Sequence, residues 1–289
     1  MNKYHRRIID VINYIDSHLD DDLSLDSLSV RVSISKFHFH RLFQSTIGIN
    51  IATYKRLVRF KKASFLLAFR NDINVIDIAL NSGYESSEAF SRAFKSTIGQ
   101  GPAAFRNKPN WQSWHNIYQQ IKQLRNELMK NKDFDYQVKI VSLEEVQVAC
   151  LEHRGSPREL GASIQKFISW RKDNHLPPSK SRTFNLLYDD PDTTSPNEYR
   201  FGLCAQVRNP VVDNAFQITN KRIPAGRCAV VRHVGSDDTI GQVVRYLYSD
   251  WLIESGEQLK DFPMFFERVS FFPDVPECEM ITDVYLSIE

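Results

Sequence analysis

Two arginines, Arg41 and Arg92, occupy the same position in two copies of one stretch of sequence. The copies are Ser35–Gly48 and Ser86–Gly99, and eight of their positions are identical. In each copy the shared Phe and Ile residues recur at the spacing i, i+4, i+8. This spacing predicts a helix with one buried stripe, and the arginine lies off that stripe. A Ser at the start and a Gly at the end are typical of helix caps. Two short helices with one buried face and one basic, polar face are the parts that a tandem DNA reader needs, because an arginine can donate two hydrogen bonds to a guanine edge.

A shorter apolar segment and a turn precede each copy. Residues 25–32 and 74–81 each predict a short helix, so the order helix, turn, helix occurs twice. Residues near 51–70 join the two units, and twenty helical residues span about 30 Å. Half-sites in the major groove on one face of DNA lie about 34–36 Å apart. The connector could therefore hold two recognition helices one turn of DNA apart; a merely solvated basic face is the alternative. Its inner side is expected to hold Tyr54, Leu57, Val58 and Phe65, and its outer side Lys55, Arg56, Arg59, Lys61 and Lys62.

With these elements in place, residues 6–107 resemble the AraC family of bacterial transcription regulators. The matching pieces are Arg41-Leu42-Phe43, Ile78-Ala79 with Gly83-Tyr84, Phe90–Lys95, and Gly101-Pro102 with Phe105-Arg106. The resemblance implies binding to double-stranded DNA in the major groove by the second helix of each pair. The residues that it places at the DNA are Lys36, Phe37, His40, Arg41 and Gln44 in the first copy, and Ser87, Glu88, Ser91, Arg92 and Lys95 in the second. Of these, Lys36, Gln44 and Lys95 are expected to face phosphates.

Length and charge divide the chain. A sequence of 289 residues suggests two domains. Residues 1–108 hold 16 Lys and Arg against 10 Asp and Glu, residues 109–132 hold 4 against 1, and residues 133–289 hold 17 against 24. A basic part joined to an acidic part indicates that one of them meets phosphates. We therefore expect a DNA-binding domain at 1–108, a linker helix at 109–132 and a second domain at 133–289.

Several classes of protein are disfavoured by what the sequence contains. The four cysteines are far apart, without a C-x-x-C spacing, and are expected to be reduced core residues. The first residues predict an amphipathic helix rather than a signal segment, and no apolar run approaches the length of a membrane span. No P-loop, G-x-S-x-G motif or zinc-type cluster occurs. We expect a cytoplasmic protein with no membrane partner, cofactor, metal or catalytic residue.

The linker, residues 109–132, carries apolar residues at helical spacing. Trp111 and Trp114 begin the series, and Ile117, Ile121, Leu124 and Leu128 continue it at alternating steps of four and three. Such a series suits either a helix packed against the body of the protein or a short dimerising seam. Two heptads are too few to choose between them, and packing against the body is favoured.

The second half repeats itself with an offset of 80 residues. Each copy reads as a strand, a turn with Gly155 or Gly235, an amphipathic helix, and then further strands. The strands that follow are expected at 184–188 and 200–207 in the first copy, and at 264–272 and 282–288 in the second. His153 and His233 recur in both copies, so they are expected to hold the corner between strand and turn rather than to act as paired bases. The duplication predicts an α+β domain with an antiparallel sheet and internal pseudo-twofold symmetry.

Glu267 is the residue in this half whose setting could do chemistry. If residues 264–272 form a strand, then Phe265, Glu267, Val269 and Phe271 share one face. A carboxylate among aromatic side chains loses solvation, so it favours a cation as partner, through charge pairing and cation–π contacts. The alternatives are that this face is exposed, or that Glu267 pairs with an arginine of the protein itself.

Residues 136–289 resemble the GyrI-like effector-binding domain, which is fused to DNA-binding domains in regulators of the Rob type. The resemblance rests on His233-Val234-Gly235, Tyr248 with Trp251-Leu252, Phe266-Glu267-Arg268 and Thr282–Leu286. Ser287 stands where the family pattern has Pro, and Gly202 stands where it has an acidic residue. The resemblance implies that Glu267 contacts a small apolar or cationic effector, as in multidrug sensing. The expected pocket lies between the two repeats and is lined by Glu267, Trp251, Phe265, Phe271, Tyr285 and Tyr188.

Together the two halves predict a multidomain protein, all-α tandem helix-turn-helix followed by α+β, that regulates bacterial transcription by binding DNA and a small-molecule effector. RNA polymerase is an expected further partner. The alternatives are a GyrI-like hydrolase tethered to DNA and a module that binds gyrase or polymerase. The effector, the operator, the direction of regulation and the oligomeric state do not follow from the sequence.

Overall fold

The computed structural model describes residues 3–19, 21, 23–130 and 136–289, which divide into two compact units. The first unit contains Met1–Asp133 together with Phe272–Glu279, and the second contains Phe134–Phe271 and Met280–Glu289. A short piece of the C-terminal sequence is therefore part of the N-terminal unit. Among the helices in the described ranges, none combines the length and the apolar character needed to cross a bilayer.

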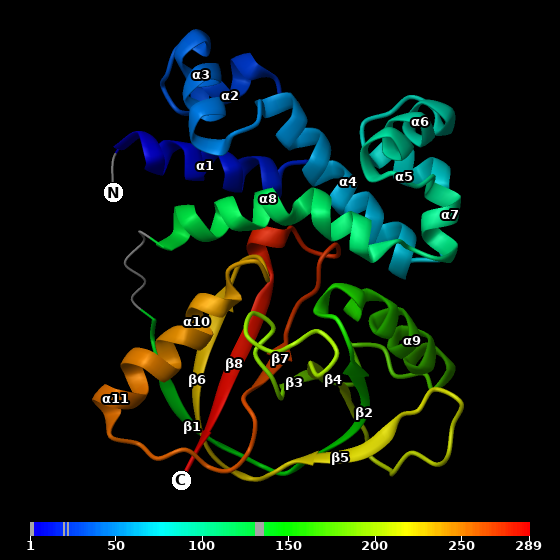
Figure 1. The fold of residues 1–289 in the computed structure, drawn as a ribbon, viewed down its shortest axis with the longest axis vertical. Coiled ribbons are helices and arrows are strands. Elements are labelled where there is room, and N and C mark those ends of the chain that lie inside the picture. Colours follow the sequence, from blue (N-terminus) through cyan, green and yellow to red (C-terminus); the bar gives the residue numbers. More distant parts are fainter. Residues whose placement is uncertain (1–2, 20, 22, 131–135) are drawn as a thin grey trace. The chain divides into compact units, whose positions relative to one another are not determined.

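The first unit is built from helices. Within it, α2 and α3 lie at one end of α4, whereas α5 and α6 lie at its other end (Figure 1). The two helix-turn-helix pairs expected from the sequence are thus joined by one straight connector of 19 residues, about 28 Å long. The helices are α1 (Lys3–Ser17), α2 (Leu25–Arg31), α3 (Lys36–Ile47), α4 (Ile51–Phe69), α5 (Val75–Asn81), α6 (Ser87–Ile98), α7 (Pro102–Asn107) and α8 (Trp111–Lys130).

The caps of α3 and α6 explain why the repeated stretch folds as it does. Ser86 accepts a hydrogen bond from the Ala89 N–H, whereas Ser35 is the N-cap of α3 without a side-chain hydrogen bond. Gly48 and Gly99 end the helices at φ of 76° and 82°, in the left-handed region that a residue with a Cβ rarely enters. Both copies therefore stop at the same point.

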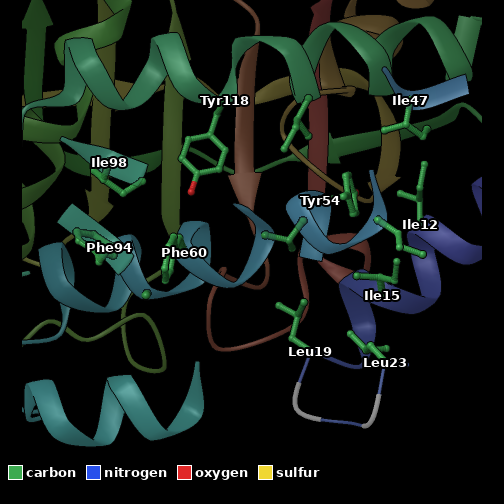
Figure 2. Packing of buried hydrophobic residues seen from close by; sticks show 14 of the residues in the cluster. Ile12, Ile15, Leu19, Leu23, Ile47, Tyr54, Phe60, Phe94, Ile98 and Tyr118 are labelled. Atoms are coloured by element: carbon green, nitrogen blue, oxygen red, sulfur yellow. The ribbon is translucent and has the colours of Figure 1, made fainter. Parts of the chain in front are cut away.

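The core of this unit is aromatic and continuous from α1 to α8. Phe60 of α4 is fully buried and contacts the rings of Tyr84, Phe90 and Phe94, with centroids 5.4–5.9 Å apart. Figure 2 shows Phe60 and Phe94 with Ile98 and Tyr118 in one part of the cluster, and Ile12, Ile15, Leu19 and Leu23 in another. Phe60 meets Phe90 and Phe94 edge-to-face and stacks on Tyr84, and both geometries add a small favourable term to the area that the rings bury.

Helix α8 packs into this core, which confirms the alternative that the sequence analysis favoured over a dimerising seam. Trp111, Trp114, Tyr118 and Ile121 are buried, and Tyr118 donates a hydrogen bond of 2.9 Å to the Leu57 carbonyl of α4. The side chain of Leu128 lies outside the described part of the chain. Because the apolar stripe is used within the chain, it is not the exposed seam that a coiled coil would require.

Lys61 was expected on the outer side of the connector, and that expectation is wrong. Its side chain is buried, and its ammonium donates to Glu277 Oε1 at 2.6 Å. Arg125 of α8 donates to Glu277 Oε2 at 2.8 Å and to Asp16 Oδ2 of α1 at 2.7 Å. Tyr54 also donates to Asp16, at 3.3 Å. A buried lysine is sustained only by such partners, and Glu277 lies 216 residues away in the sequence, beyond any helical periodicity.

Asp16 should make the stability of this unit depend on pH. Burial raises its pKa from 3.8 to about 6, against the opposing effect of Arg125. Between about pH 4 and pH 6 the folded chain keeps a proton on this group that the unfolded chain has lost, so the contribution of Asp16 to stability falls as pH rises. Groups facing it are Arg125, Glu277, Lys61, Tyr54 and Cys278.

The test is Asp16→Asn, which keeps the shape and removes the titration. We expect the free energy of unfolding of the wild type, minus that of the variant, to fall between about pH 4 and pH 6 and to be flat above that range. Urea unfolding at several pH values measures this difference. A difference that does not change over the range would contradict the assignment.

The second unit is a single antiparallel sheet with helices on one face. The strands are β1 (Lys139–Leu143), β2 (Val146–Arg154), β3 (Thr183–Leu187), β4 (Arg200–Gln206), β5 (Thr219–Ile223), β6 (Gly226–Val234), β7 (Phe265–Arg268) and β8 (Ile281–Ile288), and the helices are α9 (Leu160–Asp173), α10 (Ile240–Tyr246) and α11 (Leu252–Ser255). The order across the sheet is β1-β6-β8-β7-β3-β4-β2-β5. This order reads as two equivalent halves that meet at β3 and β7.

The duplication with an offset of 80 residues is confirmed. The bounds of β1 and β2 plus 80 give those of β5 and β6, and α9 and α10 begin 80 residues apart. His153 contacts the Ser163 hydroxyl at 2.8 Å and the Ser156 carbonyl at 3.1 Å, and His233 contacts the Ser236 carbonyl at 3.1 Å. Both histidines therefore hold the corner after their strand, as expected. Burial lowers the pKa of His233, which favours the neutral ring.

One strand is shorter than its sequence indicates. β7 ends at Arg268, and the amides of Val269 and Ser270 both donate to the carbonyl of Ile281. Two residues thus oppose one, as in a bulge, and the alternation of side chains is lost beyond that point. The expected strand over 264–272 is corrected to Phe265–Arg268, and Phe271 no longer shares a strand face with Glu267.

Candidate functional site

Two sets of side chains are candidates for function, one in each unit. In the first unit, α3 and α6 bury the apolar stripe that their repeats share, namely Phe39, Phe43 and Ile47 in α3 and Phe90, Phe94 and Ile98 in α6. The opposite faces carry the side chains expected at DNA. Those from α3, which are Lys36, Phe37, His40, Arg41 and Gln44, are all exposed. In α6, Glu88, Arg92 and Lys95 are exposed, while Ser87 and Ser91 are half-buried.

The first turn of α3 borders a hollow in the surface. Lys36, Phe37, His40 and Arg41 line it together with Leu25 and Asp26 of α2. Phe37 is 76% exposed, which is unusual for so large an apolar side chain. An exposed aromatic ring beside an arginine suits contact with a thymine methyl group and a neighbouring guanine.

Glu88 is the one acidic residue among these side chains. Its own backbone N–H, in the first turn of α6, and the hydroxyls of Ser86 and Ser87 lower the pKa of the Glu88 carboxyl. The carboxylate is therefore held charged at the start of the helix, where it can accept a hydrogen bond from a cytosine amino group. The exposed carboxylate of Glu88 distinguishes the exposed side of α6 from that of α3, where the expected DNA-facing residues include no acidic one.

In the second unit, Glu267 lies at the junction of the two repeats. Arg182, which precedes β3 in the first repeat, donates to both carboxylate oxygens of Glu267 in the second, at 2.7 and 2.6 Å. Tyr285 of β8 adds a third hydrogen bond at 3.2 Å. The Glu267 side chain is 15% exposed and that of Arg182 is 40% exposed. Of the two readings left open, pairing with an arginine of the protein is the one that the structure shows.

Further ion pairs flank this one on the same side of the sheet. Asp283 is the register partner of Glu267 on β8 and accepts two hydrogen bonds of 2.8 Å from Arg232 of β6. We call the side of the sheet that carries these groups the ionic face, defined by Glu152, Arg182, Lys221, Arg232, Glu267 and Asp283. In the pairs formed with Arg182 and Arg232, the carboxylate is the more buried partner and the guanidinium the more exposed one.

The first repeat contributes its own ion pair to the ionic face. Lys221 donates to Glu152 and to the Tyr188 hydroxyl, both at 2.7 Å. Burial alone would lower the pKa of Lys221, but these two hydrogen bonds raise it, while burial raises the pKa of Tyr188 to about 12. Gly202, opposite Glu152 in the register, has no room for the acidic residue of the family pattern, because a Cβ there would lie 2.9 Å from Leu186 Cβ.

The aromatic residues expected around Glu267 separate into two groups. Phe265 and Tyr285 stack with centroids 4.7 Å apart, and Tyr188 packs against the same apolar cluster. Trp251 instead packs in the cluster that contains Phe266 and the helix α10. Because neighbouring residues of a strand point to opposite sides, Phe266 and Trp251 lie across the sheet from Glu267. The placement of Trp251 and Phe271 beside Glu267 is therefore corrected.

Arg182 is the partner of Glu267 that the sequence reasoning missed, and Glu152, Lys221, Arg232 and Asp283 of the ionic face were not expected at the site either. Because side chains alternate along a strand, Arg182 lies on the same face as Phe184 and Leu186, and this placement could have been predicted from the sequence of the strand. Its pairing with Glu267 depends on β3 lying beside β7, a contact across 85 residues that no local pattern predicts.

The geometry of the two units defines a class: a tandem helix-turn-helix DNA-binding protein that carries a duplicated α+β domain. A family model described as "GyrI-like small molecule binding domain" matches residues 136–289, more than half of the chain, and a model described as "Helix-turn-helix domain" matches residues 28–108. The chain thus belongs to the GyrI-like family, and its helix-turn-helix half makes it an AraC-type regulator of the Rob kind.

Several known proteins are similar to this chain over different shares of its length. "Probable transcriptional regulator YgiV" of Escherichia coli K12 is 40% identical over 152 residues, which are 52% of this chain and 95% of that protein. "Right origin-binding protein" of the same organism is 35% identical over 107 residues, 37% of each chain. The solved complex of EcmrR with DNA covers 92% of this chain and 98% of that chain, at 16% identity and a TM-score of 0.45.

Proposed function

We propose that this protein is a sequence-specific, cytoplasmic DNA-binding regulator whose α3 and α6 both enter the major groove. The observation that carries the proposal is the pair of matched helices, each with a buried Phe and Ile stripe and an exposed arginine, at the two ends of α4. The resemblance of this half to Right origin-binding protein is consistent with DNA as the ligand. RNA polymerase remains an expected partner.

Selection of operators from random duplexes, followed by footprinting with the full chain, tests the proposal. We expect two protected stretches of major groove about one helical turn apart. Failure to enrich any sequence would contradict specific binding and would favour a protein-interaction module instead.

The stoichiometry of the complex is a separate prediction. Because one chain carries two readers, a single chain should cover two adjacent half-sites on one short operator. Sedimentation equilibrium of the complex measures the ratio of protein to duplex. A strict requirement for two chains would contradict this prediction and would point to a dimer interface.

We further propose that the ionic face binds a small apolar or cationic effector, and that a cationic group of the effector competes with Arg182 for Glu267. The support is the position of this pair, which joins the two repeats, together with the stacked rings of Phe265 and Tyr285 beside it. The family model that matches this half is described as small-molecule binding, which agrees with a ligand at this position. The same geometry suits binding better than hydrolysis, because the charged groups of the face are held in ion pairs and His233 is engaged at its corner.

A further inference from the structure

The segment Phe272–Glu279, called here the inserted segment, lies between β7 and β8 in the sequence but belongs to the DNA-binding unit. Three residues separate its start from Arg268, the last residue of β7, and one residue separates its end from Ile281, the first residue of β8. These are the strands that carry Glu267, Asp283 and Tyr285 of the ionic face. The chain therefore leaves the ionic face, enters the helical unit and returns within a few residues.

Within the helical unit, the inserted segment is held by three helices. Glu277 is 5% exposed and accepts hydrogen bonds from Lys61 of α4 at 2.6 Å and from Arg125 of α8 at 2.8 Å. The ring of Phe272 meets that of Phe65 of α4 edge-to-face, with centroids 5.0 Å apart. Asp274 forms an ion pair with Arg70, the C-cap of α4. The thiol of Cys278 donates to the Asn13 carbonyl of α1, at 3.7 Å.

The contacts on α4 follow one side of its second half. Lys61 and Phe65 are four residues apart, one turn of helix, and Arg70 follows at the C-terminus. Since α4 joins the pair α2 and α3 to the pair α5 and α6, a shift of this half of α4 changes the placement of one reader relative to the other. The inserted segment thus acts on the element that sets the spacing of the two half-sites.

The buried ion pairs make this attachment costly to break. Removing one partner of a buried pair leaves an uncompensated charge, which costs far more than the pair itself contributes. A displacement of the inserted segment must therefore carry α4 and α8 with it or break the network of Glu277, Lys61, Arg125 and Asp16. Packed interfaces of this kind change between discrete arrangements rather than deforming gradually.

We propose that the inserted segment is the link through which a change on the ionic face alters the affinity for DNA. The inference rests on the proposed function, because it takes the ionic face as the effector site and α3 and α6 as the readers. A ligand that displaces Arg182 from Glu267 changes the hydrogen bonding of β7 and β8, the two strands that hold the ends of the inserted segment. Its buried contacts then pass that change to α4.

The experiment perturbs the ionic face by substitution, so that no ligand is needed. In the full chain, Glu267→Gln is expected to change the dissociation constant for a selected operator by about fivefold or more, the lower end of typical allosteric coupling. The same substitution should have no effect when Gly-Ser-Gly-Ser is inserted both between Phe271 and Phe272 and between Glu279 and Met280. An identical insertion in the exposed turn at 190–197 serves as the control and should leave the effect intact.

Two further variants keep the test decisive if a protein does not fold. If Glu267→Gln does not fold, Tyr285→Phe is used in its place, because it removes a single hydrogen bond from Glu267. If the insertion variants do not fold, Glu277→Gln is used in their place, because it weakens the attachment of the inserted segment without changing the length of the chain. No effect of either ionic-face substitution on operator affinity, or an equal effect with and without an intact inserted segment, would overturn the inference. Binding of a cationic rhodamine dye to the unaltered chain is measured separately. Its absence, with the coupling present, would overturn the effector proposal but not the link.

Discussion

Arg41→Ala is expected to weaken binding to the selected operator by about 5- to 150-fold, while leaving binding to random duplexes almost unchanged. An arginine that donates two hydrogen bonds to guanine contributes about 1–3 kcal/mol of discrimination, and a factor of ten corresponds to about 1.4 kcal/mol. Arg41 is exposed on α3, on the side opposite the buried Phe39 and Phe43, so its guanidinium is accessible to a groove. Competition between the operator and random duplexes, measured by fluorescence anisotropy at one fixed salt concentration, gives both affinities.

Lys95→Ala is the matched control for this experiment. Lys95 is also exposed but lies in the last turn of α6, where it is expected to meet phosphate. Its loss should weaken binding to all duplexes by a similar factor and should reduce the salt dependence. If Arg41→Ala weakened specific and random binding equally, Arg41 would be a phosphate contact rather than a base reader.

Arg182→Gln is expected to tighten the binding of a cationic rhodamine dye by about tenfold, or about 1.4 kcal/mol. In the unaltered chain a cation must first displace the guanidinium, which makes two charge-assisted hydrogen bonds to a carboxylate that is only 15% exposed. Without Arg182 the carboxylate still lacks solvent and accepts the dye as its counter-ion. Fluorescence titration measures the dissociation constant.

Glu267→Gln should act in the opposite direction on the same dye. The substitution removes the negative charge and leaves Arg182 to repel cations, so we expect at least about tenfold weaker binding. It should also abolish the gain produced by Arg182→Gln in the double variant. A neutral analogue of the dye serves as the control and should be little affected. Equal losses for charged and neutral probes would show that Glu267 has a structural role only.

The repeats made much of the fold predictable from the sequence. Periodicity and caps located α3 and α6, because Phe39 and Phe90, with their partners, bury the same stripe and Gly48 and Gly99 stop both helices. The offset of 80 residues likewise gave the duplicated sheet, since equal spacing of strand and helix signals requires equal elements. These features depend on local sequence patterns, each of which lies within a single helix or strand or at its ends.

Features that depend on distant partners were not predictable. Lys61 reads as one more exposed cation of an amphipathic helix until Glu277 is placed beside it. Arg182 becomes part of the site only through the pairing of β3 with β7, and the bulge after Arg268 moves Phe271 off its expected face. In each case the local sequence pattern is compatible with more than one environment of the side chain, so the actual environment is known only from the tertiary structure.

The unlike faces of α3 and α6 have a consequence for the arrangement of promoters. The exposed side of α3 is basic and aromatic, with Phe37 and Arg41, whereas that of α6 carries Glu88 beside Arg92. If α3 and α6 read DNA as proposed, one chain with two different readers would recognise a sequence without dyad symmetry, unlike a two-fold dimer on a palindrome. Such a site has a direction, and inverting it turns the bound protein end for end. The orientation of the operator relative to the transcription start would then decide which side of the bound protein faces the start site.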